Sequence, residues 1–114
     1  MKIEYWENSS DKSPVKEYIQ NIIDNKAKNK IRWVIQDLLV EFGIGIIKTK
    51  HGKKLKGYSL YELIIPYNGI YHRIIFCVIS DTAWLLHAFG KKSNHTPKKE
   101  IKITLNRQNF LNNH

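Results

Sequence analysis

Cysteine is almost absent from this chain of 114 residues. A single one, Cys77, excludes a disulfide framework, and it falls within an apolar run where it is expected to act as a small apolar side chain. Long hydrophobic runs are missing too, and the N-terminal MKIEYWEN lacks the apolar centre of a signal peptide. We therefore expect a cytoplasmic protein without a membrane span, and the length predicts one domain over residues 1–114.

Acidic residues are scarce compared with basic ones. Ten Asp and Glu stand against 19 Lys and Arg, which gives a formal net charge of +9. The excess is concentrated in two groups of lysines that flank residues 60–92. These are Lys48, Lys50, Lys53, Lys54 and Lys56 before the stretch, and Lys91, Lys92, Lys98, Lys99 and Lys102 after it. Such a balance favours a polyanionic partner, nucleic acid before membrane, over a basic surface that serves only solubility.

Recognisable cofactor and nucleophile motifs are also missing. The five histidines and Cys77 show none of the close spacings of zinc ligands, and neither a serine or cysteine triad nor a glycine-rich phosphate motif occurs. We expect no metal and no cofactor.

What the sequence does contain, over residues 60–92, is three apolar runs separated by two short polar breaks. Asn68-Gly69 has the residues of a type I′ hairpin turn, and Ser80-Asp81 makes a second two-residue break. The pattern predicts a three-stranded antiparallel meander.

The register of this meander assigns side chains to faces. Ile64 would lie opposite Arg73 and Arg73 opposite Ala88, on the same face as Glu62. The other face is the more apolar and is expected to pack under helices. It comprises Tyr61, Leu63, Ile65, His72, Ile74, Phe76, Leu85, His87 and Phe89. Arg73 would then lie on an open face, either paired with Glu62 or held for an anionic ligand.

Helices are predicted before the meander. Residues 2–6 alternate as a short strand, and Ser13-Pro14 with an apolar stripe predicts a helix from Pro14 to about Asp24. Residues 25–29 would connect it to a second helix that ends at Gly43, which makes a helical hairpin across the sheet.

The other segments have weaker signals. The lysine-rich residues 44–57 are expected to form a loop. Thr96-Pro97 starts a C-terminal helix that has only a narrow apolar stripe, and its last residues, 112–114, should fray. Trp33 and Val40 lie outside the apolar stripe of the second helix. They either add to the core or mark the surface that a protein partner contacts. The predicted fold is α+β: a small antiparallel sheet, an N-terminal helical hairpin on one face and a C-terminal helix.

Cations, a tyrosine, a histidine and a carboxylate remain as candidates for chemistry. Cleavage of RNA at a 2′-hydroxyl needs a base, stabilisation of the phosphate's charge and protonation of the leaving 5′-oxygen. Arginine and lysine can stabilise that charge without a metal. A lysine, histidine or glutamate tuned by its neighbours can transfer the proton.

Four segments, taken together, resemble a known family. They are SPVKEYI at 13–19, KKLKGYSLYEL at 53–63, YHRIIF at 71–76 and LLHAFGKKSNHTPKKEI at 85–101. They resemble, in order, the phage-derived branch of the RelE/HigB toxins of type II toxin–antitoxin systems. The resemblance implies a RelE-like fold and a metal-independent endoribonuclease, an mRNA interferase that inhibits translation on the ribosome. It also implies a HigA-like helix-turn-helix antitoxin, through which alone the protein would contact DNA.

The resemblance also implies site residues. Arg73 matches the arginine expected to stabilise the phosphate, Lys91 and Lys92 the paired basic residues, and Tyr61-Glu62 the aromatic–acidic pair. His87 completes the catalytic candidates. The RNA-binding candidates are Lys50, Lys53, Lys54, Lys56 and Lys98.

One position departs from the family's pattern, because Ile64 stands where arginine commonly follows the Glu-Leu pair. Two alternatives therefore stay open. One is a catalytically weak RelE-fold protein that only binds RNA or its antitoxin, and the other is a ParE-like toxin that acts on DNA gyrase.

Overall fold

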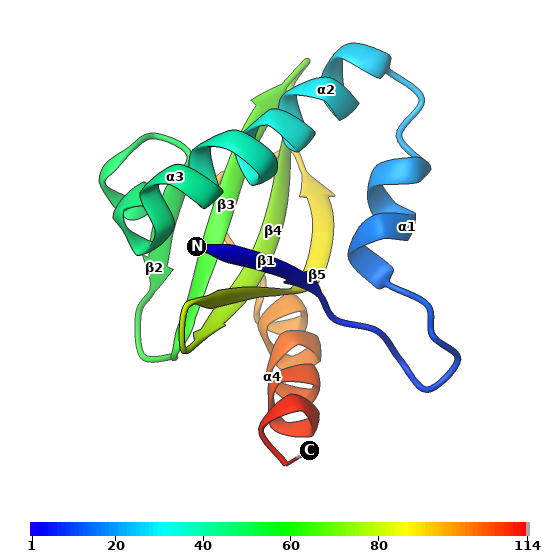
Figure 1. The fold of residues 1–114 in the computed structure, drawn as a ribbon. Helices are drawn as coiled ribbons and strands as arrows, with labels where there is room; N and C mark the ends of the chain where they lie inside the picture. The colour runs from blue at the N-terminus through cyan, green and yellow to red at the C-terminus, as the bar shows by residue number, and fades with distance from the viewer. Residues whose placement is uncertain (114) are drawn as a thin grey trace.

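A five-stranded sheet forms the centre of the computed structural model, which describes residues 1–113 (Figure 1). The strands are β1 (Lys2–Tyr5), β2 (Gly52–Leu55), β3 (Leu60–Tyr67), β4 (Ile70–Ile79) and β5 (Thr82–Lys91), in the spatial order β1-β5-β4-β3-β2. The predicted α+β class is confirmed. The sheet is mixed, because edge strand β1 runs parallel to β5 while every other pair is antiparallel.

The predicted meander is confirmed as β3, β4 and β5. Asn68 and Gly69 have φ values of 50° and 78°, as the hairpin turn requires, and Ser80 has a φ of 56°. Ile64 pairs with Arg73 as predicted.

A β-bulge changes the second half of the predicted register. Phe76 pairs with Leu85, but Ile75 pairs with His87, so Leu86 is an extra residue in β5. Side chains alternate along a strand, so one extra residue moves those beyond it to the opposite face. Arg73 therefore pairs with Phe89 rather than Ala88. The prediction that His87 and Phe89 lie under the helical hairpin is wrong.

The helical hairpin covers one face of the sheet as predicted, with different bounds. Helix α1 spans Pro14–Gln20, and the Ser13 Oγ accepts from the Lys16 N–H at 3.2 Å. Asp24 is the N-cap of the next helix and accepts from the N–H of Lys26 at 2.8 Å. Residues 25–29 are thus the start of this helix rather than a connection, because the aspartate caps the helix that follows it.

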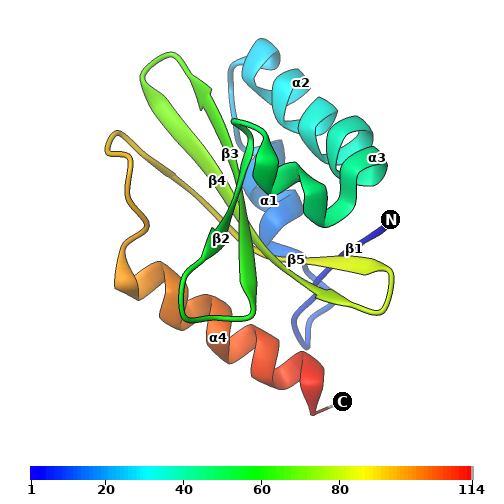
Figure 2. The same cartoon turned by 90° about the vertical axis from the view of Figure 1, so that its left-hand side faces the viewer.

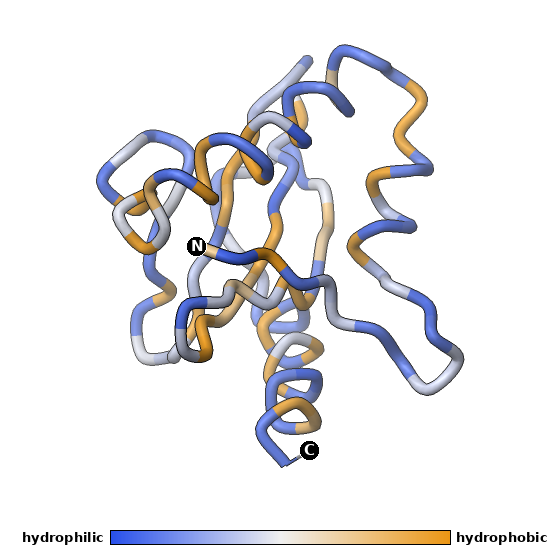
Figure 3. Tube along the Cα trace, viewed as in Figure 1, coloured by the Kyte–Doolittle hydropathy of each residue, from blue (hydrophilic) through white to orange (hydrophobic). Residues whose placement is uncertain are grey.

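The second helix continues without a break to Phe42. It comprises α2 (Asn25–Trp33), a π-helical segment (Val34–Leu39) and α3 (Val40–Phe42), and Gly43 follows with a φ of 55°. The core between hairpin and sheet contains Val15, Ile19, Ile31, Val34, Ile35, Leu39, Ile46, Leu63, Ile65, Ile74, Phe76, Ala83 and Leu85. Apolar stretches of β3 and β4 lie behind these helices in Figure 3.

The lysine-rich segment contains structure where a loop was expected. A 3₁₀ helix (Gly43–Lys48) precedes β2, in which Lys53 pairs with Glu62. Gly52 is required there, since a Cβ at this position would lie 2.7 Å from the Ile46 carbonyl oxygen. A short edge strand can carry lysines on its solvent side, so its apolar alternation is weak.

The C-terminal helix α4 (Lys98–Asn112) covers part of the face that was expected to be open (Figure 2). A second core lies beneath it, made of Leu55, Leu60, Ile75, Cys77, Leu86 and Phe89, against which Ile101, Leu105 and Leu111 pack. Asn112 is the last helical residue, and His114, one of the three residues expected to fray, lies outside the described residues. The prediction of a sheet with one open face is therefore wrong.

Candidate nucleic-acid interface

A buried ion pair lies in the middle of the sheet. Arg73 of β4 and Glu62 of β3 are fully buried, and the Arg73 Nη1 donates to the Glu62 Oε1 over 2.6 Å. The Thr96 hydroxyl donates to both carboxylate oxygens, at 3.1 and 2.8 Å, and the Asn94 Oδ1 accepts from the Arg73 Nη2 at 2.9 Å. Lys53 Nζ is 3.5 Å from Glu62 Oε1. The pairing of Arg73 with Glu62 is confirmed, whereas its placement on an open face is wrong.

The surroundings of Arg73 leave its guanidinium no contact with solvent. The Tyr71 ring centre is 5.5 Å from the Arg73 Cζ, and within residues 1–113 the Arg73 Nε has no hydrogen-bond partner. Asn94 and Thr96 belong to the connector between β5 and α4, residues 92–97. A phosphate could reach the guanidinium only after this connector moved.

Cations accessible to solvent border the buried pair. We call Lys53, Lys91 and Lys92 the lysine rim. The Lys53 side chain is 39% exposed, Lys91 is partly exposed and Lys92 is exposed. Over the described part of the chain, neither Lys91 nor Lys92 forms an ion pair. The rim therefore has positive charge available for an anion.

A shallow groove of about 420 Å³ adjoins this rim at the β3–β4 turn. Its lining residues are Pro66, Tyr67, Asn68, Gly69, Ile70, Tyr71 and Lys92. Tyr71 also lies across the ladder from Lys91. Two phenol rings beside two ammonium groups can stack a base and contact its phosphate, as single-stranded nucleic acid requires.

His87 lies apart from the lysine rim, buried beneath α4. Its Nε2 is 3.0 Å from the Glu100 Oε1, and the Arg107 Nη1 is 3.0 Å from its Nδ1. Arginine can only donate, so the Nδ1 accepts and the neutral ring donates its Nε2–H to Glu100. Burial is the main cause that lowers the His87 pKa, while the hydrogen bond to Glu100 opposes it. His87 and Lys91 are four positions apart along β5, which corresponds to about 13 Å.

Tyr61 also lies apart, on the hairpin face of β3. Its ring stacks on Phe76 with centroids 5.5 Å apart, and the Lys54 Nζ is 5.7 Å from its ring centre. Lys54 also donates to the carbonyls of Leu55 and Tyr58. The structure thus brings together Glu62, Arg73 and the lysine rim, but neither Tyr61 nor His87. The remaining RNA-binding candidates, Lys50, Lys56 and Lys98, are exposed.

A family model matches most of the chain. The model described as Phage derived protein Gp49-like (DUF891) matches residues 18–109. The chain belongs to this family. Gp49-like proteins are toxin-like, which implies an antitoxin partner in general. A comparison with curated proteins finds no match.

The matched range of this Gp49-like protein includes the buried pair, the connector and the lysine rim. Within the described residues, no group of three or more His, Cys, Asp or Glu side chains is placed to hold a metal ion. No helix in that part of the chain is long and apolar enough to cross a membrane.

Sequence reasoning missed three residues of this site. Thr96 was assigned to a helix cap, but its hydroxyl binds Glu62, and Pro97 is the N-cap of α4 without a side-chain cap bond. Asn94 and Tyr71 lie within the segments that resemble the family, but each acts through a contact made only in the folded chain, so neither was singled out. The segment SNHTP, with its small polar residues directly after the paired lysines, was the available hint.

Proposed function

We propose that this Gp49-like protein is the toxin of a type II toxin–antitoxin pair and cleaves mRNA on the ribosome without a metal. The resemblance of four segments to RelE/HigB toxins supports the proposal, as does an α+β fold consistent with theirs. The observation that carries it is the lysine rim, in which Lys91 and Lys92 form no ion pair with any residue of 1–113, beside a groove lined by Tyr67 and Tyr71.

In this proposal, the 2′-oxygen of a nucleotide in the groove attacks the adjacent phosphorus. The bond from phosphorus to the 5′-oxygen breaks, which leaves a 2′,3′-cyclic phosphate and a free 5′-hydroxyl. Lys91 and Lys92 stabilise the extra negative charge of the pentacovalent phosphate, and Tyr71 stacks on a base. His95, exposed on the connector, is the side chain best suited to transfer the proton.

Arg73 has a different part in this scheme from the one the family resemblance implies. Its guanidinium is buried and engaged, so we propose that the Arg73–Glu62 pair is a positioning element rather than a phosphate contact. Through Asn94 and Thr96 the pair anchors the connector that carries Lys92 and His95. Tyr61 and His87 have no role in it, because one faces the hairpin and the other lies under α4.

The decisive experiment maps new mRNA 5′ ends by their position within codons after the protein is induced in cells. Cuts in phase with codons support the proposal. Lys91→Gln with Lys92→Gln should lower cleavage about a hundredfold or more, by analogy with the loss of an oxyanion donor. Lys2→Gln with Lys12→Gln is the matched control, since both lysines are exposed and remove the same charge. Neither lines the groove, and Lys2 pairs with Thr82, at the end of β5 opposite to Lys91. Equal losses in both pairs would contradict the assignment of the rim.

Salt dependence separately tests the basic arm, which we define as Lys53 and Lys54 of β2 with Lys56 just after it. Lys53, Lys54 and Lys56 should each replace a condensed counterion on single-stranded RNA. Their joint substitution by glutamine should reduce the slope of log K against log salt by about 2 in magnitude. Binding that does not depend on salt would contradict phosphate contact by this arm.

A second candidate is a protein that binds RNA or its antitoxin but scarcely cleaves. It is favoured by the burial of Arg73 and by Ile64, which is partly exposed where the RelE/HigB pattern has arginine. Intact mRNA with bound RNA would support this candidate. Intact mRNA with a DNA-damage response would instead indicate a ParE-like action on gyrase.

A further inference from the structure

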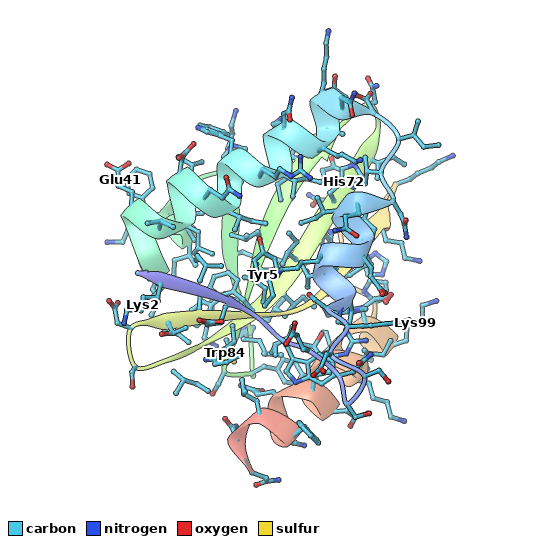
Figure 4. All side chains as sticks on the ribbon, turned by 45° about the vertical axis from the view of Figure 1, so that its right-hand side comes forward. Lys2, Tyr5, Glu41, His72, Trp84 and Lys99 are labelled. Carbon is cyan, nitrogen blue, oxygen red and sulfur yellow. The ribbon has the colours of Figure 1, made fainter. Side chains whose placement is uncertain are left out.

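A second depression lies on the other face of the sheet, between α1, α2 and β1. It has a volume of about 220 Å³ and is lined by Tyr5, Lys16, Ile19, Gln20, Arg32 and Gln36. Figure 4 shows Tyr5 reaching from β1 into the space between the two helices. We call this depression the hairpin pocket. It shares no lining residue with the groove beside the lysine rim.

The two cations of the hairpin pocket have no carboxylate partner in the described part of the chain. The Lys16 Nζ lies 5.0 Å from the centre of the Tyr5 ring, and the Arg32 charge acts on the same phenol. Among residues 1–113, neither Lys16 nor Arg32 forms an ion pair. Burial raises the Tyr5 pKa, so its hydroxyl stays protonated and can donate. Two amides, Gln20 and Gln36, complete a lining rich in hydrogen-bond donors.

The charge around the pocket suits a single anionic group rather than a polyanion. Residues 1–47, which include β1, α1 and α2, contain seven Lys or Arg and seven Asp or Glu. Residues 48–114 contain twelve Lys or Arg and three Asp or Glu, so the whole net charge of +9 comes from this second part of the chain. A nucleic acid would be drawn to that part, since long-range attraction follows net charge.

An exposed apolar side chain follows the pocket along the second helix. Val40 is 40% exposed and lies one turn beyond Gln36, whereas Trp33, 45% exposed, packs edge-on against His51 beside β2. Val40 lies eight residues, about two helical turns, beyond Arg32. A protein segment with an acidic side chain and an aliphatic one at that spacing would match both features, whereas a phosphate chain would not match the apolar contact.

We propose that the hairpin pocket binds a carboxylate side chain of a protein partner, which for a toxin-like chain is its antitoxin. The carboxylate accepts from Arg32 and Lys16, and an aliphatic neighbour of the acidic residue packs on Val40. This inference uses the antitoxin that family membership implies and does not depend on ribonuclease activity.

Nuclear magnetic resonance of the ¹⁵N-labelled full chain tests the pocket. The probe is N-acetyl-glutamate amide, and the matched ligand is its glutamine counterpart, which lacks the charge. Saturable shifts at Gln20, Arg32 and Gln36 with the first probe only are expected. Lys16→Gln with Arg32→Gln should weaken that binding about tenfold or more, as loss of charge-assisted hydrogen bonds would.

Lys12→Gln with Lys26→Gln removes the same charge from the N-terminal part of the chain, outside the pocket, and should leave the affinity unchanged. Shifts confined to the lysine rim, no saturable shift, or equal binding of both probes would overturn the proposal. So would tighter binding of an RNA hexanucleotide than of the glutamate probe at these residues.

A neutralisation assay separates this inference from the proposed function. Co-expression of the product of the adjacent gene should rescue growth from the parent chain and from the Lys12→Gln, Lys26→Gln control. It should rescue the Lys16→Gln, Arg32→Gln variant poorly, although that variant cleaves mRNA as the parent does. Full rescue of the pocket variant would overturn the docking role, whatever the outcome of the cleavage assay.

Discussion

Replacement of Arg73 by methionine tests the buried ion pair directly. The change removes the guanidinium from the Glu62 Oε1, 2.6 Å away, and leaves a carboxylate that is 0% exposed with the Thr96 hydroxyl and a more distant Lys53. Breaking a buried pair in this way costs about 3–5 kcal/mol, because the remaining charge is desolvated without a partner. A chain of this size has a total stability of roughly 6–17 kcal/mol. The variant should therefore be strongly destabilised but still folded at low temperature.

The double variant Arg73→Met, Glu62→Leu separates the ion pair from the packing around it. With both charges gone, the stability should return to within about 1 kcal/mol of the parent or exceed it, since neither desolvation cost remains. The four proteins form a double-mutant cycle, with an expected coupling of about 3 kcal/mol.

Urea unfolding followed by circular dichroism measures each step of this cycle. With a slope of about 2 kcal/mol per molar urea, the single Arg73 variant should unfold at about 2 M less urea than the parent. Lys12→Gln, an exposed change, should not shift the midpoint. Single variants that each cost under about 1 kcal/mol and add without coupling would refute the reasoning. Arg73 would then be solvated and free to contact a phosphate, as the sequence resemblance implies.

Three further predictions concern other parts of the fold. Burial lowers the pKa values of His87 and His72, so the folded state binds fewer protons than the unfolded state. The free energy of unfolding should therefore fall as the pH drops below about 6.5. His87→Gln should reduce part of this pH dependence in urea midpoints measured from pH 7.5 to 5. Burial raises the pKa of Cys77 to about 11, so iodoacetamide should label it only in denaturant, and rapid labelling of the native protein would contradict its place under α4. Ile64→Arg puts a second cation across the ladder from the buried arginine and should cost a few tenths to about 1 kcal/mol of stability; if the missing arginine limits activity, this variant should cleave ribosome-bound mRNA faster than the parent.

Local signals predicted the elements that depend on interactions between residues only a few positions apart. The Asn68-Gly69 turn places the meander because only residues that tolerate positive φ make such a hairpin, and both have it. The Ser13 cap and the stripe that follows predicted α1 for the same reason, since cap and contacts lie within one or two turns. These features depend on short-range sterics and hydrogen bonds, which the order of residues determines.

The family's residues were found from sequence, but their surroundings were not. Arg73 was matched to a phosphate-stabilising arginine, and the structure buries it against Glu62. The two residues that complete the pair, Asn94 and Thr96, come from a connector far along the chain. A contact between distant segments leaves no periodic pattern in either of them, so the pairing, and with it the accessibility of the arginine, could not be predicted.

The sequence by itself therefore determined the meander, the helical hairpin, the excess of positive charge in the second part of the chain and membership in a toxin-like family. Tertiary structure alone decided which face each side chain occupies beyond Leu86, because one extra residue in β5 reverses the alternation that every register argument uses. It also decided that α4 covers the face expected to be open. The thin apolar stripe of α4 does not specify the surface on which the helix packs. Only the assembled sheet presents an apolar surface that this helix can cover.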